Sequence, residues 1–458
     1  MESHKRYPLS PSQKLIFLAW QYTIHKQVPN IPTSCFLSEE IDLAVLKSAV
    51  EESVKRNDAF AIRITKQGKE KMQYFSFKSV LVLEIIDFTG KKMQDMEAFF
   101  YKIGSTRMSL YDKPMAKIYV IKAPDGKSGI FSCISHLIMD SWAISMFYKD
   151  ILEVYYAMKN QEPIPKALPS YESALQKEIA YRSSEKYEKD YAFWNEELSG
   201  PKPIFTHVNG SAVLEKQREK KKDPQLRFGN SFFIKTTAAH VVRMIEKQDV
   251  DKMKAFCLEN SIPTMQALFL MGMRTYLAKV NSREKDVSIN SVVARRGTLE
   301  EKLSGGTRVH PLPFRTIFEE DATFMEMLQI ILEKQNILYR HADFDPMEAF
   351  KIMHKNYDFP PQNTYITLHL TFQPVPLEAK NGVKVSTKWY CNGTAASSIG
   401  MSVMDGDGTG ALRCYYEYHD SMIKRQTIDK AHDYIIKIIH AGIGNPSATL
   451  KELLDLPV

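Results

Sequence analysis

The segment FSCISHLIMDSW, residues Phe131–Trp142, holds the residue types in this chain that are best suited to chemistry. His136 and Asp140 stand four residues apart, after an apolar run that predicts a strand and before a pattern that predicts a helix. Histidine suits general base work because its unperturbed pKa of about 6.5 lies near neutral pH. The chain has 12 histidines, so such a pair also arises by chance. Judged by spacing alone, His136 is better explained as a structural histidine that is hydrogen-bonded inside a core.

The elements that must position this pair alternate between helical and strand-like patterns along the whole chain. A strand at 129–135 leads into the pair, and a helix is expected to begin near Ser141. Ser10 and Asp42 can cap two earlier helices. A charged helical stretch from Tyr171 to Leu198 predicts a connector between two lobes. We therefore expect an α/β protein of two lobes.

One charged run stands apart from these elements. The segment EKQREKKK, Glu215–Lys222, is strongly basic and follows no clear apolar period. We expect it to be a solvated loop rather than a docking patch. Further helices are expected at Val250–Glu259, Thr264–Val280, Ala322–Arg340 and Thr427–Ala441. Further strands are expected at Ala116–Lys122, Val287–Ala294, Tyr365–Phe372, Val383–Tyr390 and Leu412–Tyr418.

Length and composition bound the class of protein. The 458 residues exceed one ordinary core and predict two or three domains. Contents of 44% hydrophobic and 25% charged residues are typical of a globular protein and exclude a disordered or collagenous chain. The net charge of +7 is too small to predict nucleic-acid binding. No apolar signal segment and no run of about 18 uncharged apolar residues occurs, so we expect a cytoplasmic protein without a membrane span.

The cysteines also favour a cytoplasmic protein. Their number is odd, they are far apart, and they form no CxxC pair, so we expect reduced and mostly buried thiols. No local ligand set for zinc is present, and we expect neither a metal nor a redox cofactor. The cysteines are Cys35, Cys133, Cys257, Cys391 and Cys414.

The segment around His136 resembles the HHxxxDG signature of the acyltransferase superfamily that includes chloramphenicol acetyltransferase and the condensation domains of nonribosomal peptide synthetases. The resemblance to condensation domains covers nearly the whole chain, in the family's order. Five further segments carry it: LSPSQKLIFLAW from Leu9, VKRNDAFAIRI from Val54, YAFWNEELSG from Tyr191, SVVARRGTLEEKLSGGTRVHPLPFR from Ser291 and HADFDPMEAF from His341.

The resemblance implies a fold of two chloramphenicol-acetyltransferase-like lobes that form a V around a central substrate tunnel. On this basis residues 1–175 are expected to form the N-terminal lobe and residues 176–458 the C-terminal lobe. The family's substrates usually arrive on the phosphopantetheine arms of carrier proteins, so the implied partners are an acyl or peptidyl carrier protein and a small-molecule amine or second carrier-bound acceptor. No intrinsic cofactor is implied, and a monomer is expected.

The resemblance also implies roles for single residues. His136 corresponds to the second histidine of the signature, at the centre of the tunnel. It would position the acceptor amine, take its proton or stabilise the tetrahedral intermediate. Asp140 would be mainly structural and would pair with an arginine of the second lobe. By its spacing to Gly306 that arginine is Arg296, with Arg295 as the second choice.

Two residues depart from the signature. Ser135 replaces its first histidine, which leaves His136 in place, and Ser141 replaces its glycine. A serine adds bulk where glycine leaves room for a substrate arm, so it could narrow the tunnel, select a different substrate or mark a degenerate domain. Trp142 follows directly and is expected near the tunnel, and His310, three residues after Thr307, is expected there in a mostly structural role.

Three functions remain open. The first is a free-standing condensation-type acyltransferase that forms an amide from a carrier-bound acyl or aminoacyl thioester and an amine, in peptide or antibiotic biosynthesis. The second forms an ester from an acyl thioester on a carrier or coenzyme A and an alcohol. The third is a non-catalytic module that binds carrier proteins or partner enzymes; Ser135 and Ser141 motivate it, whereas the retained His136 and Asp140 argue against it.

Overall fold

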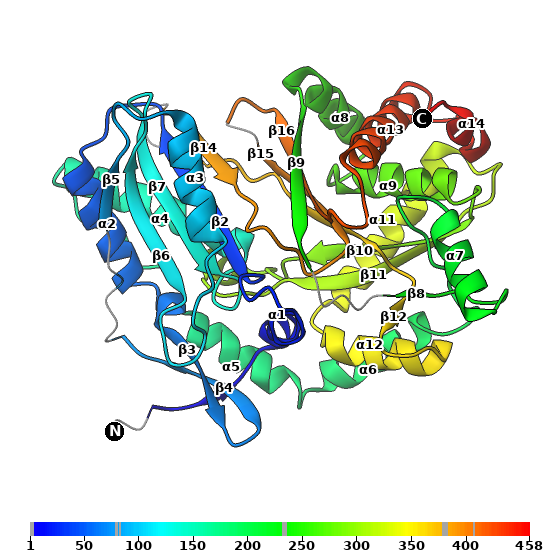
Figure 1. Cartoon of the computed structure of the whole chain (residues 1–458), viewed down its shortest axis with the longest axis horizontal. Coiled ribbons are helices and arrows are strands. Elements are labelled where there is room, and N and C mark those ends of the chain that lie inside the picture. Colours follow the sequence, from blue (N-terminus) through cyan, green and yellow to red (C-terminus); the bar gives the residue numbers. More distant parts are fainter. Residues whose placement is uncertain (1–3, 78–80, 82–83, 231–235, 378–382, 406–407) are drawn as a thin grey trace.

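Two α/β lobes lie side by side in the computed structural model (Figure 1). A five-stranded sheet forms the centre of the N-terminal lobe, and a six-stranded sheet forms the centre of the C-terminal lobe. This arrangement confirms the α/β fold of two lobes expected from the sequence. The structure describes residues 4–77, 81, 84–230, 236–377, 383–405 and 408–458.

The sheet of the N-terminal lobe has the order β14-β2-β7-β6-β5. Helices cover both faces, and strand β7 (Ser128–Ser135) is therefore buried along its whole length. Ile130 and Ile134 pack in the core shared with α2 and α4, while Phe131 and Cys133 pack in the core shared with α3. Burial on both faces explains why this strand is a continuous apolar run rather than an alternating one.

The elements of this lobe follow the chain from the N-terminus. They are β1 (Tyr7–Pro8), α1 (Pro11–Tyr22), β2 (Asn30–Leu37), α2 (Leu43–Lys55), η1 (Asp58–Ala61), β3 (Ile62–Gln67), β4 (Glu70–Phe75), β5 (Glu84–Asp87), α3 (Met93–Gly104), β6 (Ala116–Lys122), β7 and α4 (Ser141–Lys159). Ser10 caps α1 and Asp42 caps α2, as predicted. Strands β1, β4 and β3 form a separate small sheet.

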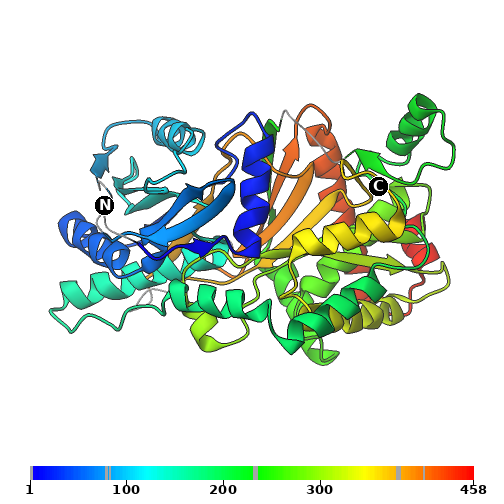
Figure 2. The same ribbon diagram turned by 90° about the horizontal axis from the view of Figure 1, so that it is seen from below.

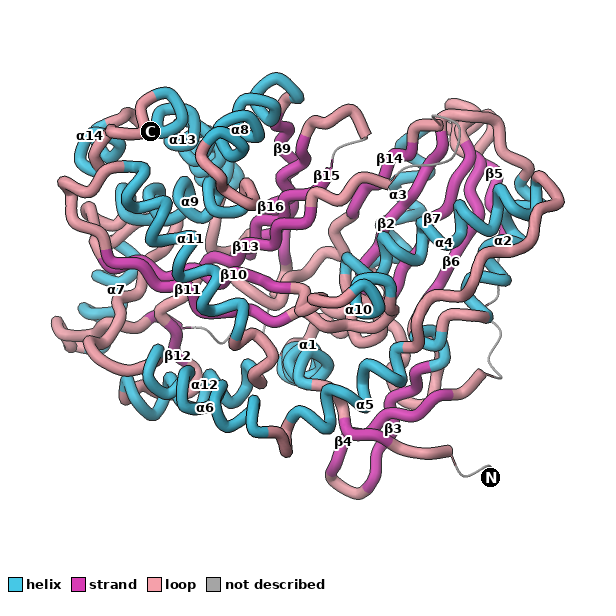
Figure 3. Tube along the Cα trace, turned by 180° about the vertical axis from the view of Figure 1, so that it is seen from behind, coloured by secondary structure: helices cyan, strands magenta, loops and turns pink. Residues whose placement is uncertain are grey.

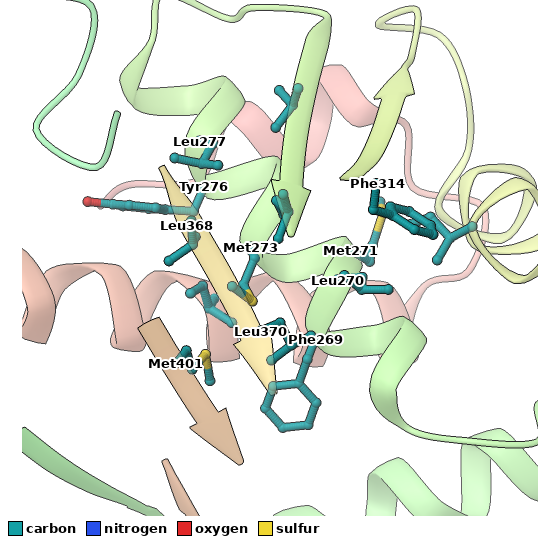
Figure 4. Packing of buried hydrophobic residues seen from close by; sticks show 14 of the residues in the cluster. Phe269, Leu270, Met271, Met273, Tyr276, Leu277, Phe314, Leu368, Leu370 and Met401 are labelled. Carbon is teal, nitrogen blue, oxygen red and sulfur yellow. The ribbon is translucent and has the colours of Figure 1, made fainter. Parts of the chain in front are cut away.

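The sheet of the C-terminal lobe has the order β11-β10-β13-β15-β16-β9. Helix α9 (Gln266–Val280) is buried against it, with Phe269, Leu270 and Met273 packed near Leu368 and Leu370 of β13 (Figure 4). The remaining elements are α7 (Ala212–Lys221), β8 (Gly229–Asn230), β9 (Ala238–Ile245), α8 (Lys247–Glu259), β10 (Asp286–Val293), α10 (Leu299–Leu303), β11 (His310–Ile317), α11 (Phe324–Arg340), α12 (Pro346–Tyr357), β12 (Asn363–Thr364), β13 (Leu368–Gln373), β14 (Val385–Trp389), β15 (Ile399–Asp405), β16 (Leu412–His419), α13 (Arg425–Gly444) and α14 (Leu450–Asp455).

Strand β14 joins the two lobes. It comes from the second half of the chain but pairs antiparallel with β2, with Thr387 opposite Cys35, and so completes the sheet of the N-terminal lobe. The sequence assigns all of 176–458 to the second lobe, and β14 is an exception to that assignment; the boundary near residue 175 otherwise stays a prediction. Helix α1 lies between the lobes in two perpendicular views (Figures 1 and 2).

The charged stretch expected to be helical over Tyr171–Leu198 is helical, but it forms two helices separated by a turn. Helix α5 (Tyr171–Tyr181) ends at a short turn, and α6 (Glu185–Glu197) begins after Ser184, whose hydroxyl accepts a hydrogen bond from the backbone of Tyr187. A serine that caps a new helix competes with continuation of the old one. Figure 3 shows both helices running below the two lobes.

The basic run is a helix as well, so the loop expected at Glu215–Lys222 is wrong. Its residues make most of α7. Lys, Glu, Gln and Arg are good helix formers even without an apolar stripe, and Arg218 pairs with Glu215 one turn earlier at 2.7 Å.

Two expectations from composition also have structural counterparts. Four of the cysteines are buried, Cys391 is half-buried, and all are free thiols. Within the described ranges, no helix is long and apolar enough to cross a membrane.

Candidate active site

His136 stands just past the end of β7, in the turn that leads to α4. The preceding Ser135 builds this turn: its carbonyl accepts from the N–H of Ile138 at 2.9 Å, and its hydroxyl accepts from the N–H of Leu137 at 3.3 Å. Ser135 is fully buried and therefore supports the backbone beneath His136. The rigid strand on one side and the capped helix on the other hold the histidine in place.

The imidazole of His136 faces the second lobe. Its Nδ1 lies 3.3 Å from the hydroxyl of Thr307, and its backbone N–H donates to the carbonyl of Pro29 at 2.6 Å. Burial lowers the pKa of His136 below its ordinary 6.5, and the nearby charge of Asp140 only partly opposes this. The ring is therefore neutral at pH 7, and when Nδ1–H donates to Thr307, Nε2 carries a free lone pair.

Asp140 is completely buried and fully hydrogen-bonded. It caps α4 by accepting from the N–H of Ala143 at 2.8 Å, and it accepts from the N–H of Arg308 at 2.9 Å. Both carboxylate oxygens lie 3.1 Å from Nη2 of Arg296. The structure therefore places Arg296, rather than Arg295, on this carboxylate.

The two arginines organise the segment 297–308, which crosses from the second lobe to the start of α4. Arg296 also donates to the carbonyls of Glu301, Ser304 and Gly306 at 2.7, 2.8 and 3.1 Å. Arg295 turns away to donate to the carbonyl of Arg308 at 2.8 Å and forms an ion pair with Glu178. Each guanidinium thus replaces lost water with backbone carbonyls and a carboxylate.

Gly306 is a point of close contact between this segment and the first lobe. It pairs with Met139 in a single parallel bridge, and its φ of +83° is one that side-chain-bearing residues rarely adopt. A Cβ at this position would lie 1.9 Å from a ring carbon of Tyr171. A glycine is required here both by conformation and by space.

Ser141 and Trp142 also contact the second lobe. The hydroxyl of Ser141 donates to the side-chain carbonyl of Gln373, at the end of β13, at 2.6 Å. The indole N–H of Trp142 donates to the carbonyl of Lys302 at 2.7 Å. The serine that replaces the glycine of the signature therefore makes a direct hydrogen bond between the lobes.

A cavity of about 1000 Å³ lies between α1 and the inner face of the six-stranded sheet, and His136 is on its wall. Strands β10 and β13 contribute Asn290, Val292, His369 and Thr371, and the segment at the start of β11 contributes Val309 and Pro311. Helices α1, α7 and α12 contribute Leu15, Ile16, Ala19, Gln217, Lys220, Lys221, Phe350 and Met353. Most of the exposed surface of the wall is apolar, and about half of the lining residues add polar side chains, a combination that suits an organic substrate.

His310 takes no part in this wall. It is fully buried, its Nδ1 lies 2.9 Å from the carbonyl of Ala342, and burial lowers its pKa well below 6.5. Its neighbours Val309 and Pro311 face the cavity instead, because successive side chains along an extended segment point to opposite sides.

The polar residues of the wall that sequence reasoning missed include Asn290, His369 and His207. A signal for His369 existed: Thr367, His369 and Thr371 alternate with Leu368 and Leu370 in a predicted strand, which marks one polar face. No comparable pattern surrounds His207, which reaches the cavity from a loop.

Comparisons with known proteins agree with this architecture. Residues 3–457 match the family described as the condensation domain. Surfactin synthase subunit 1 and a plipastatin synthase, both of Bacillus subtilis (strain 168), are 21% and 22% identical to the chain over 456 residues, 98% of its length. The chain spans only 12% and 17% of these two relatives.

Solved structures show the same fold. The first condensation domain of the calcium-dependent antibiotic synthetase superposes with a TM-score of 0.81 at 16% identity, covering 98% of this chain and 99% of that one. A mutant starter condensation domain of rhizomide synthetase, in complex with C8-CoA, also gives 0.81 at 15% identity, covering 98% and 97%. These likenesses confirm the fold of two chloramphenicol-acetyltransferase-like lobes that the sequence implied.

Proposed function

The chain belongs to the condensation-domain family, homologous to domains of nonribosomal peptide synthetases, and on this premise we propose that it is an acyltransferase that forms an amide. Its donor is an acyl or aminoacyl thioester on the phosphopantetheine arm of a carrier protein, and its acceptor is an amine. The observation that carries the proposal is a neutral histidine, His136, on the wall of a largely apolar cavity where the two lobes meet.

In the proposed reaction the lone pair of the amine attacks the thioester carbonyl carbon. The C–N bond forms, and the electron pair of the carbonyl moves to oxygen. The C–S bond then breaks, the carbonyl re-forms, and the sulfur leaves with the proton that the nitrogen loses. Neutral His136 can take that proton from nitrogen and return it to sulfur, and it holds the acceptor in position for attack.

Asp140 and Arg296 support this site without touching the substrate. Their pair fixes the start of α4 and the segment 297–308 around His136. Ser135 supports the turn from below, and Ser141 and Trp142 hold the lobes together beside it. Ser141 thereby has a structural use that is compatible with an active domain.

The α7 edge of the cavity favours an anionic group on the substrate. Lys220 and Lys221 line this edge, whereas no Asp or Glu lines the cavity among the described residues. The phosphate of a phosphopantetheine arm, or of coenzyme A, is such a group. The net charge of +7 also favours approach of an acidic carrier protein.

The test mixes the protein with an acyl-loaded carrier protein and, separately, with amines and alcohols, and follows products by mass spectrometry. We expect an amide that disappears in His136→Ala and persists in His440→Ala, which removes a half-exposed histidine on the outer helix α13. If product forms only with alcohols and never with amines, the protein is an ester-forming acyltransferase and not an amide-forming one. Binding of the carrier protein without formation of any product would support the non-catalytic module in place of an enzyme.

A further inference from the structure

Two polar side chains of the cavity wall face each other across neighbouring strands. Asn290 of β10 and His369 of β13 are paired in the parallel register of these strands, and both line the cavity. Asn290 is 6% exposed, and its Oδ1 is buried without a hydrogen-bond partner. Among the described residues His369 has no hydrogen-bond partner either. Buried polar atoms are normally paired, so the partnerless Oδ1 of Asn290, with the half-buried ring of His369 beside it, points to a missing ligand.

The chemistry of the pair defines that ligand. An asparagine amide and a neutral imidazole each offer a donor and an acceptor. Burial lowers the pKa of His369 to about 4, so the ring is uncharged at pH 7. No carboxylate of the described chain lines the cavity, so a cationic group would find no counter-ion there. The complement of this pair is a neutral group that both donates and accepts, such as a secondary amide.

The position of the pair can be measured along β13. Along β13 the cavity-facing residues alternate from Thr367 through His369 and Thr371, and Gln373 at the strand end bonds Ser141 beside the His136 turn. Four residues of extended chain separate His369 from Gln373, a distance of about 13 Å. The pair therefore lies about 13 Å along β13 from the strand end that bonds Ser141.

We propose that Asn290 and His369 bind a secondary amide of the substrate and so hold the substrate in this cavity. This inference rests on the proposed function for its substrates. The amide belongs either to the pantetheine arm or to an N-acylated aminoacyl group, and the same pair of hydrogen bonds serves both.

A binding experiment tests the pair without requiring turnover. Free pantetheine and N-acetylalaninamide, the latter standing for an acyl group with its own amide, are titrated into protein labelled in its histidine rings. We expect the His369 signals to shift with at least one probe, and the Kd to rise roughly tenfold in Asn290→Leu and in His369→Leu, as expected for one lost hydrogen bond. The probe that responds identifies the source of the amide.

Controls separate binding from folding. His440→Ala, on the outer helix α13 and outside the cavity wall, should leave the Kd within about twofold. His369→Gln restores a donor and an acceptor and should recover affinity. The leucine variants should keep the parent's Tm, because they replace polar groups that have no partner in the protein.

Kinetics give the second readout. If the amide is that of the pantetheine arm, the leucine variants should raise KM and preserve kcat with acyl N-acetylcysteamine thioesters, which carry this amide. If the amide lies in the acyl group, the same rise in KM should appear with an N-acetylalanyl ethyl thioester and not with a simple acyl N-acetylcysteamine thioester. Unchanged Kd values for both probes, or equal losses with both thioesters, would overturn the assignment. An inactive parent that still binds a probe through His369 would contradict the proposed function alone.

Discussion

The buried pair of Asp140 and Arg296 shows how a single residue organises this site. The carboxylate is completely buried, the guanidinium almost so, and each is surrounded by hydrogen bonds. Taking two charges out of water is costly, and the hydrogen bonds to both groups offset much of this cost, although Nε of Arg296 is buried without a partner. Such a pair contributes less to net stability than its removal would suggest, since losing one partner leaves the other charge buried alone.

Asp140→Ala is therefore expected to destabilise the protein. It removes the cap of α4 and isolates Arg296, and the free energy of unfolding should fall by about 3–5 kcal/mol. Urea unfolding measured by circular dichroism checks this. Asp140→Asn keeps the shape and some hydrogen bonds and should lose less. An alanine variant as stable as the parent but inactive would contradict the structural role and give Asp140 a part in the reaction.

The second prediction at this scale concerns pH. The depressed pKa of His136 means that its ring stays neutral as pH falls through 6.5 and takes up a proton only below that value. A general base must be neutral, so activity should fall on the acid side with a midpoint below pH 6.5. The measurement is kcat/KM against pH with an aromatic amine, which remains neutral over this range. A midpoint above 6.5 would mean that another group controls the acid limb.

At the scale of elements, the segment 297–308 links the second lobe to the start of α4. It contains the short helix α10, it carries the carbonyls that Arg296 binds, and it places Thr307 beside His136. Gly306 lets it come this close, because the space above its Cα is filled by the buried ring of Tyr171. The geometry of the site thus depends on the contact between Gly306 and Tyr171, neither of which is a catalytic residue.

Gly306→Ala tests this contact. Left-handed backbone and a steric clash with Tyr171 should together lower the free energy of unfolding by about 2–5 kcal/mol. Gly444→Ala is the matched control, because a Cβ at the end of α13 meets no atom within 4 Å. Thermal and urea unfolding of both variants compare the two positions. Equal stability of the Gly306 variant and the parent would show that the segment can move away from Tyr171.

At the scale of the whole molecule, the two lobes are interlocked rather than merely joined by a connector. Strand β14 leaves the second half of the chain to complete the first sheet beside β2, and Asn392, just beyond it, donates to the carbonyl of Asn30 at 2.8 Å. Ser141, Trp142 and Arg295 add further contacts between the halves, the last by a bond from Arg295 to the hydroxyl of Ser12 at 3.4 Å. The cavity therefore has walls that neither half possesses alone.

The corresponding prediction concerns fragments of the chain. Residues 1–200 alone lack β14 and expose the edge of β2, so they should aggregate, because an unpaired buried strand is a template for further pairing. Co-expression with residues 201–458 should restore a soluble complex. Size-exclusion chromatography with light scattering distinguishes these states. A monomeric 1–200 fragment that unfolds cooperatively would show that the first lobe is independent of β14.

Much of this molecule is predictable from local patterns. The helices capped by Ser10 and Asp42, the buried strand before His136 and the polar alternation around His369 all follow from periodicity and capping, which depend on neighbours in the sequence. The connector and α7 show the limits of such patterns. A serine cap divides the first, and helix formers with an ion pair make a helix of the second without an apolar stripe.

By itself, the sequence determined the α/β class, the two lobes and the turn in which His136 and Asp140 stand four apart. Only the tertiary structure decided which arginine faces Asp140, that Ser141 bonds Gln373, that β14 belongs to the first sheet and that Asn290 faces His369. The physical reason is the separation along the sequence over which each kind of interaction acts. Capping and periodicity act over a few residues, whereas these contacts join residues from about 80 to 350 positions apart, and they form only when the whole core packs.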